Sequence, residues 1–223
     1  MHLSAEDHAR VSAAVTAAEL TTDGEIVTVV AGQSDSYHDV ALHWAVLAML
    51  LALALLAWQP GVAAWLHVRL VDPWSQSVPP GWYLVIALIL ISAVFLLVRV
   101  ALAWDALRLA LTPGGTKARR VQRKAMQLFR TGAEKRTKGA TGVLLYLSLA
   151  EHRAEIIAEE SIHSKVSAEV WGEAMAALIA AVKDGRPGDG MAEAVTQIGV
   201  VLAEHFPRSA GDTNELPDRL IVL

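Results

Sequence analysis

Two long runs in the middle of the chain are almost wholly apolar, with His43 and Ser92 as their small polar exceptions, whereas the segments on either side mix apolar and polar positions. The runs are residues 42–58 and 82–98, each 17 residues long. An α-helix of this length spans roughly 26 Å at 1.5 Å per residue, close to the ~30 Å thickness of a bilayer's hydrocarbon core. The pattern predicts two transmembrane helices joined by a short loop rich in proline and tryptophan. The alternative is a pair of buried helices in a soluble core.

The flanks of the two runs favour the membrane interpretation. Six of the seven tryptophans lie in or beside the runs, and only Trp171 lies elsewhere. Indole has an apolar body and one N–H donor, so it prefers the interface between lipid and water. We therefore expect aromatic belts at the helix ends, formed by Trp44, Trp58, Trp82 and Trp104.

The basic residues predict the orientation of the hairpin. Residues 59–81 contain one cation, Arg69, whereas residues 99–138 contain eleven lysines and arginines. By the positive-inside rule, both ends of the chain are cytoplasmic and the loop lies outside. Five of these cations, at the start of the helix that follows the hairpin, are candidates for contact with anionic lipid headgroups: Lys117, Arg119, Arg120, Arg123 and Lys124.

The mixed segments predict a layered α/β domain. Ser4 and Asp7 resemble a capping box, and the β-branched run at 25–31 is typical of a central strand. The remaining pattern predicts helices at 5–19, 116–136, 167–183 and 191–206, a loop at 184–190, and further strands at 141–148 and 153–158. For residues 216–223 two alternatives stay open, a short edge strand or a mobile tail. Since the two later strands form a hairpin, the sheet is expected to mix parallel and antiparallel pairs.

These elements suggest a domain interrupted by the hairpin. The expected divisions are 1–40 for its first part, 41–104 for the hairpin, 105–116 for a linker, 117–207 for the second part and 208–223 for a tail. Composition narrows the chemistry: the chain has no cysteine, which excludes disulfides and thiolate sites, and its net charge of −4 argues against nucleic acid as a partner.

Five segments of the predicted α/β domain have a pattern shared with a known family: 24–27, 34–37, 141–148, 152–157 and 188–190. With them, about 1–40 and 117–207 of the chain resemble the TPM domain family, in its bacterial membrane branch. The resemblance implies a three-layer α/β/α sandwich, here interrupted by the transmembrane hairpin, and a place in a bacterial plasma (inner) membrane. The resemblance implies one of two roles that have been proposed for relatives. One is the assembly or regulation of membrane complexes, and the other is acid phosphatase activity with calcium binding.

Polar residues follow two strands that should be parallel neighbours. A right-handed crossover would bring residues 33–37 and 148–152 together at the carboxyl end of the sheet, where α/β proteins usually bind ligands. The candidates for a ligand crevice are Asp35, Tyr37, Glu151 and His152, and Asp35, Asp39 and Glu151 are candidate oxygen ligands for a divalent cation such as Ca²⁺ or Mg²⁺. The alternative is that these residues serve as caps and turns.

No catalytic motif is present. The chain lacks a P-loop, G-x-S-x-G and H-E-x-x-H, and Gly114-Gly115-Thr116-Lys117 lacks the strand that precedes a phosphate-binding loop. The sequence therefore predicts a module that binds, assembles or regulates another membrane component on the cytoplasmic face. The enzymatic alternative is a phosphatase that uses a metal-activated water.

Overall fold

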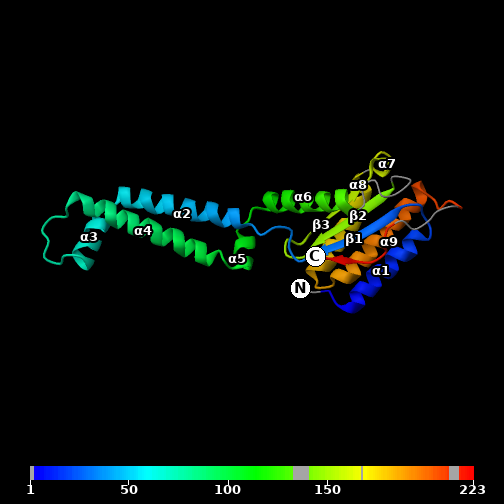
Figure 1. The fold of residues 1–223 in the computed structure, drawn as a ribbon, viewed down its shortest axis with the longest axis horizontal. Helices are drawn as coiled ribbons and strands as arrows, with labels where there is room; N and C mark the ends of the chain where they lie inside the picture. The colour runs from blue at the N-terminus through cyan, green and yellow to red at the C-terminus, as the bar shows by residue number, and fades with distance from the viewer. Residues whose placement is uncertain (1–2, 133–140, 167, 211–215) are drawn as a thin grey trace. The chain divides into compact units, whose positions relative to one another are not determined.

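The chain forms two compact units. A computed structural model of the protein describes residues 3–132, 141–166, 168–210 and 216–223. One unit combines Met1–Asp35 with Pro113–Leu223, and the other is Ser36–Thr112. The first unit contains a β-sheet covered by helices, and the second is helical (Figure 1).

The sheet of the first unit has four strands in the order β3-β2-β1-β4. β1 (Glu25–Ala31) pairs in parallel with β2 (Gly142–Ser148) and with the short β4 (Ile221–Val222), while β3 (Arg153–Ala158) pairs antiparallel with β2. Both central strands are buried at every position, as their continuous apolar sequences predict for strands covered on both faces. The predicted mixed sheet is thus confirmed.

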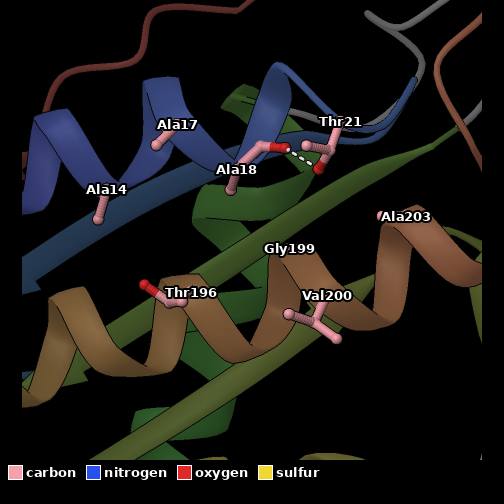
Figure 2. A pocket seen from close by; sticks show the side chains of 8 residues that line it. All are labelled: Ala14, Ala17, Ala18, Thr21, Thr196, Gly199, Val200 and Ala203. Carbon is pink, nitrogen blue, oxygen red and sulfur yellow. Dashed lines mark hydrogen bonds between the residues drawn. The ribbon is translucent and has the colours of Figure 1, made fainter.

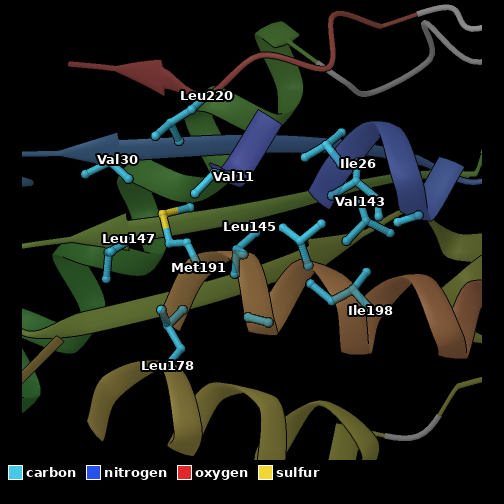
Figure 3. Close-up of a cluster of buried hydrophobic side chains, with 14 of the residues drawn as sticks. Val11, Ile26, Val30, Val143, Leu145, Leu147, Leu178, Met191, Ile198 and Leu220 are labelled. Carbon is cyan, nitrogen blue, oxygen red and sulfur yellow. The ribbon is translucent and has the colours of Figure 1, made fainter. Parts of the chain in front are cut away.

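Helices cover both faces of this sheet. α1 (Ala5–Glu19), α8 (Ala168–Lys183) and α9 (Pro187–His205) pack on one face, and α6 (Gly114–Gly132) packs on the other (Figure 1). Figure 3 shows the first of the two cores, where β2 residues such as Leu145 face Met191 and Ile198 of α9. The expected three-layer α/β/α sandwich is therefore present.

The first helix begins as its sequence predicts. The Asp7 amide donates to Ser4 Oγ over 3.1 Å, and the Ser4 amide donates to Asp7 Oδ2 over 2.9 Å, which completes the capping box. These bonds satisfy amides that the first turn of a helix otherwise leaves unpaired.

The last helix starts four residues earlier than expected. Residues 187–190 belong to α9 and not to a loop, with Pro187 in its first turn. The two glycines are required by packing: a Cβ at Gly188 would lie 2.5 Å from Asp7 Cβ, and one at Gly190 would lie 2.7 Å from Ala181 Cβ. Glycine at these two positions permits close contact between helices. From the sequence alone, the same glycines had indicated a loop.

Other boundaries also differ. α6 begins at Gly114 and extends to Gly132, so the expected linker at 105–116 contains its first turn. Residues 133–136 of the helix predicted at 116–136 lie outside the described residues, as does residue 167 at the start of the next predicted helix. Glu160–His163 forms a short helix, α7, and Glu159 before it is buried.

The second unit contains the two apolar runs as helices. α2 (His38–Trp58) and α4 (Pro80–Ala101) pack against each other, and both are long and apolar enough to cross a membrane. Only 17% of the apolar window of α2 and 6% of that of α4 is buried, unlike the core helices of a soluble domain. The connecting loop contains an additional helix, α3 (Pro60–Leu70), and a short helix, α5 (Asp105–Ala110), follows α4.

Candidate functional site

The carboxyl ends of β1 and β2 lie side by side, as their parallel pairing requires. Beyond the strands, the Leu149 amide donates to the Ala31 carbonyl and the Ala150 amide donates to the Gly32 carbonyl, each over 3.0 Å. The ladder therefore continues past both strands. It brings the segment at 33–35 beside the turn at 149–152, which is the end of the sheet where the sequence predicts a ligand crevice.

Glu151 connects the two chain segments at this end. Its Oε1 accepts a 2.9 Å hydrogen bond from the Ser34 amide, and its Oε2 accepts one from the Ser148 hydroxyl. The side chain is buried, at 6% exposure. Glu151 thus closes the turn and holds the end of β1 to the end of β2.

A buried tyrosine extends the same network. Tyr146 OH and Ser34 Oγ lie 2.9 Å apart in a hydrogen bond, and Tyr146 is fully buried. Burial raises the pKa of the Tyr146 phenol, and the Glu151 carboxyl adds to this effect, while hydrogen bonds with Ser34 and Ser148 oppose it. The phenol is therefore a neutral member of the network at neutral pH.

Asp35, which follows the carboxyl end of β1, forms an ion pair with Arg120 of α6. Its Oδ2 accepts a 2.8 Å hydrogen bond from Arg120 Nη1 of α6, whose side chain is only 15% exposed. The Asp35 carbonyl accepts a 2.6 Å bond from Gln33 Nε2. The aspartate therefore anchors the start of α6 to the segment that leaves β1.

The other predicted crevice residues occupy different surroundings. His152 is exposed and adopts a left-handed backbone conformation with φ 47°, at the last position of the β2–β3 turn. Tyr37 and Asp39 belong to the helical unit: Tyr37 is the buried N-cap of α2 with φ 53°, and Asp39 lies exposed in its first turn. Among the described residues, no three histidines or carboxylates gather in a group that could hold a metal ion.

The five cations at the start of α6 differ in their exposure. Arg119 and Arg123 are exposed, while Lys117 and Lys124 are half-buried. Arg120 differs from these because it pairs with Asp35. The exposed charge of this helix face therefore comes mainly from Arg119 and Arg123.

The tryptophans lie at both ends of the α2–α4 pair. Trp58 ends α2 and Trp82 lies in the first turn of α4, whereas Trp44 and Trp104 lie at the opposite ends of the two helices. Trp58 and Trp104 are 81% and 79% exposed. The Trp82 ring packs edge-on against His67 of α3, with centroids 5.3 Å apart.

A second group of carboxyls lies at the amino end of β1. Glu19, buried at the end of α1, accepts a 2.9 Å hydrogen bond from the Ile26 amide, while Glu25 Oε2 accepts one from the Leu216 amide over 3.1 Å. Burial raises the pKa of Glu19 to about 8, opposed by the Ile26 bond and reinforced by Glu25 and Asp218. This cluster joins α1, β1 and the segment that leads to β4.

The first unit also has a shallow apolar hollow between α1 and α9, of about 370 Å³ (Figure 2). The hollow exists because small side chains meet there, with Gly199 facing Ala18. The Thr21 hydroxyl donates a 2.8 Å hydrogen bond to the Ala18 carbonyl. Its lining contains no titratable group: Ala14, Ala17, Ala18, Thr21, Thr196, Gly199, Val200 and Ala203. The hollow therefore offers a packing surface and not a reactive centre.

Comparison with known proteins agrees with this geometry. The protein is an α/β/α domain whose chain also carries a pair of long apolar helices. Residues 110–201 match the family model of the TPM domain. The matched residues include α6, β2, β3 and α8, and most of α9.

One solved structure supports the same fold. The NMR structure of the BA42 protein from the psychrophilic bacterium Bizionia argentinensis is similar with a TM-score of 0.56 and 17% sequence identity, covering 100% of this chain and 97% of that chain. At this identity the likeness shows the fold alone. No curated protein matches the sequence.

Sequence reasoning identified Asp35 and Glu151 but not their partners. Ser148 and Tyr146 read as ordinary strand residues, and Arg120 read as one cation among five. The parallel register, which pairs Ala31 with Ser148, would have placed Ser148 beside the end of β1. The pairing of Arg120 with Asp35 depends on how α6 is rotated over the sheet, for which the sequence has no local signal.

Proposed function

We propose that the protein is a membrane-anchored TPM domain that binds or assists another membrane component on the cytoplasmic face. One observation carries this proposal: the carboxyls at the ligand end of the sheet already serve the protein's own hydrogen bonds. Glu151 holds Ser34 and Ser148, and Asp35 holds Arg120. Groups fixed in this way shape a surface rather than supply a base or a nucleophile.

The membrane part of the proposal rests on the hairpin helices. Their apolar side chains are exposed over a length that fits a bilayer, and exposed tryptophans lie at their ends. The cations that follow α4 favour a cytoplasmic position for both termini. The chain would then hold its α/β/α unit close to other proteins of the same membrane.

Topology reporters test this arrangement. Reporters fused before Met1 and after Leu223 should both give cytoplasmic signals, and one inserted near Ser75 should give the opposite signal, because the cation excess follows the hairpin. Each insertion site should be tested with a pair of reporters that are active on opposite sides. A periplasmic signal after Leu223 would contradict the proposed orientation.

A phosphatase remains the second candidate, supported by the presence of Asp35 and Glu151 at the same end of the sheet. The purified full chain should show no turnover of p-nitrophenyl phosphate above a mock purification, with or without Mg²⁺ or Ca²⁺. Turnover that Asp35→Ala abolishes and Asp184→Ala preserves would overturn the binding proposal. Asp184 is a suitable control because it is an exposed aspartate of the same unit.

A further inference from the structure

The charge of α6 has one sign. The helix contains six lysines and arginines and no aspartate or glutamate, although the chain as a whole has a net charge of −4. Exposed helices are usually stabilised by carboxylates one turn away from cations, and like charges at the same spacing destabilise them. The positive-inside rule does not require this exclusion, because carboxylates contribute little to orientation. The composition therefore indicates negative charge supplied from outside the helix.

Three of these cations form a stripe along the outer face of α6. Arg123 and Arg130 follow Arg119 after about one and three helical turns, so all three lie on one face. They are exposed, whereas Val121 and Phe129 on the opposite face are buried against the sheet. Within the described part of the chain, none of the three takes part in an ion pair. We call these three residues the arginine stripe.

The helices on the other face of the sheet have the opposite charge. α1 and α9 lie in that layer (Figure 1). α9 contains three carboxylates and no lysine or arginine, and the only arginine of α1, Arg10, is paired with Glu6 and Asp189. A negatively charged surface would attract the α6 face of the unit and repel the α1 and α9 face, which selects one orientation.

The covalent chain keeps the arginine stripe near the apolar helices. Arg120, the neighbour of Arg119, pairs with Asp35 over 2.8 Å, and only residues 36 and 37 separate Asp35 from α2. On the other side, residues 102–113 join α4 to α6. Chain length alone therefore holds α6 within reach of the surface of a bilayer that contains α2 and α4, at a high effective concentration.

We propose that the arginine stripe binds the anionic lipid headgroups of the membrane in which the chain is anchored, so that the α6 face of the α/β/α unit lies on the bilayer. The inference rests on the proposed membrane anchoring. Guanidinium groups suit phosphate oxygens because they present several N–H donors in a planar fork. Each arginine near such a surface should favour the docked arrangement by about fivefold at most, and by less as salt screens the charge.

Fluorescence quenching in vesicles tests the docking. The chain has no cysteine, so Gln122→Cys on α6 and Thr196→Cys on α9 can each be labelled alone, and both positions are exposed and uncharged. The full chain is placed in vesicles of phosphatidylcholine, or of phosphatidylcholine and phosphatidylglycerol in equal amounts, with a quencher attached to the headgroups. Quenching should be stronger at Gln122 than at Thr196 in the vesicles with phosphatidylglycerol. The difference should shrink in phosphatidylcholine alone and at high salt.

Two pairs of substitutions separate the stripe from general charge. Arg119→Gln with Arg123→Gln should lower the ratio of docked to undocked chain by on the order of tenfold. The unit should stay folded, because both side chains are exposed. Lys165→Gln with Lys183→Gln removes the same charge from exposed positions outside α6 and should leave the ratio unchanged.

Quenching at Gln122 that is equal in the two kinds of vesicle would overturn the proposal. So would an equal effect of the arginine and lysine pairs. Extraction with alkaline carbonate tests the anchor separately. A chain that resists extraction but shows no quenching dependent on phosphatidylglycerol keeps the anchor and overturns the stripe. A chain that carbonate removes, and whose quenching depends on phosphatidylglycerol, refutes the anchor and supports the stripe.

Discussion

The free energy of unfolding of the α/β/α unit should fall by on the order of 4 kcal/mol between pH 5 and pH 8, through the titration of Glu19. The Glu19 pKa is about 8 in the folded chain, against an ordinary value of 4.5. Burial of the carboxyl beside Glu25 and Asp218 is the cause. The folded state therefore retains a proton on Glu19 over a range in which the unfolded chain releases it.

Stability falls as the pH rises because the folded chain binds one proton more than the unfolded chain over this range. Below pH 4.5 the stabilising contribution of the neutral carboxyl is fully present, and it is lost at about 1.4 kcal/mol per pH unit until the folded group ionises near pH 8. The loss concerns contacts between α1, β1 and the segment at 216–220, because these elements surround Glu19. Hydrogen exchange at the Ile26 and Val30 amides, corrected for its intrinsic dependence on pH, measures it.

Glu19→Gln should remove most of this pH dependence. The amide keeps an acceptor for the Ile26 N–H and cannot ionise, so the variant should be more stable than the wild type at pH 8. Glu6→Gln is a matched control, because Glu6 is an exposed residue of the same helix. An unchanged pH dependence in Glu19→Gln would show that another group is responsible.

Glu151→Ala should lower the free energy of unfolding by about 2–4 kcal/mol. The substitution leaves the half-buried Ser34 amide and the buried Ser148 hydroxyl without their acceptor. Each unsatisfied buried donor costs about 1–3 kcal/mol. Urea unfolding of the full chain in detergent micelles measures this loss, with hydrogen exchange at the amides of β1 and β2 as the readout.

Two comparisons make the Glu151 result specific. Glu160→Ala removes an exposed carboxyl near the other end of β3 and should change stability by less than about 0.5 kcal/mol. Glu151→Gln keeps one acceptor and should fall between the alanine variant and the wild type. Equal stability of Glu151→Ala and Glu160→Ala would contradict the connecting role of Glu151.

The elements bounded by local chemistry were predicted accurately from the sequence. α1 matched because a capping box precedes it and turn residues follow it, and β1 and β3 matched because polar turns bound their apolar runs. The start of α9 was wrong because Gly188 and Gly190 have a tertiary role: they let this helix approach α1 and α8. The α3 helix was missed because the proline and tryptophan that it contains, Pro60 and Trp65, were interpreted as loop residues.

The candidate site was predictable only as far as strand order fixed it. Parallel pairing of β1 and β2 was enough to bring Asp35 and Glu151 to one end of the sheet. The role of each side chain there was not predictable. The role of Asp35 depends on the position of Arg120 on α6, and the role of Glu151 depends on the course of the β2–β3 turn. Tyr37 and Asp39 lie close to Asp35 in sequence, yet they belong to the helical unit.

The insertion of a helical unit between β1 and β2 affects how the protein is made. Residues 32–141 separate two strands that are immediate neighbours in the sheet, and β4 near position 221 also pairs with β1. At synthesis rates of about 5–20 residues per second, β1 leaves the ribosome roughly 5 to 20 s before its partner β2. The nascent α1 and β1 must remain unpaired while residues 38–101 emerge. Chaperones that recognise exposed apolar strands therefore have a defined period in which to bind this segment.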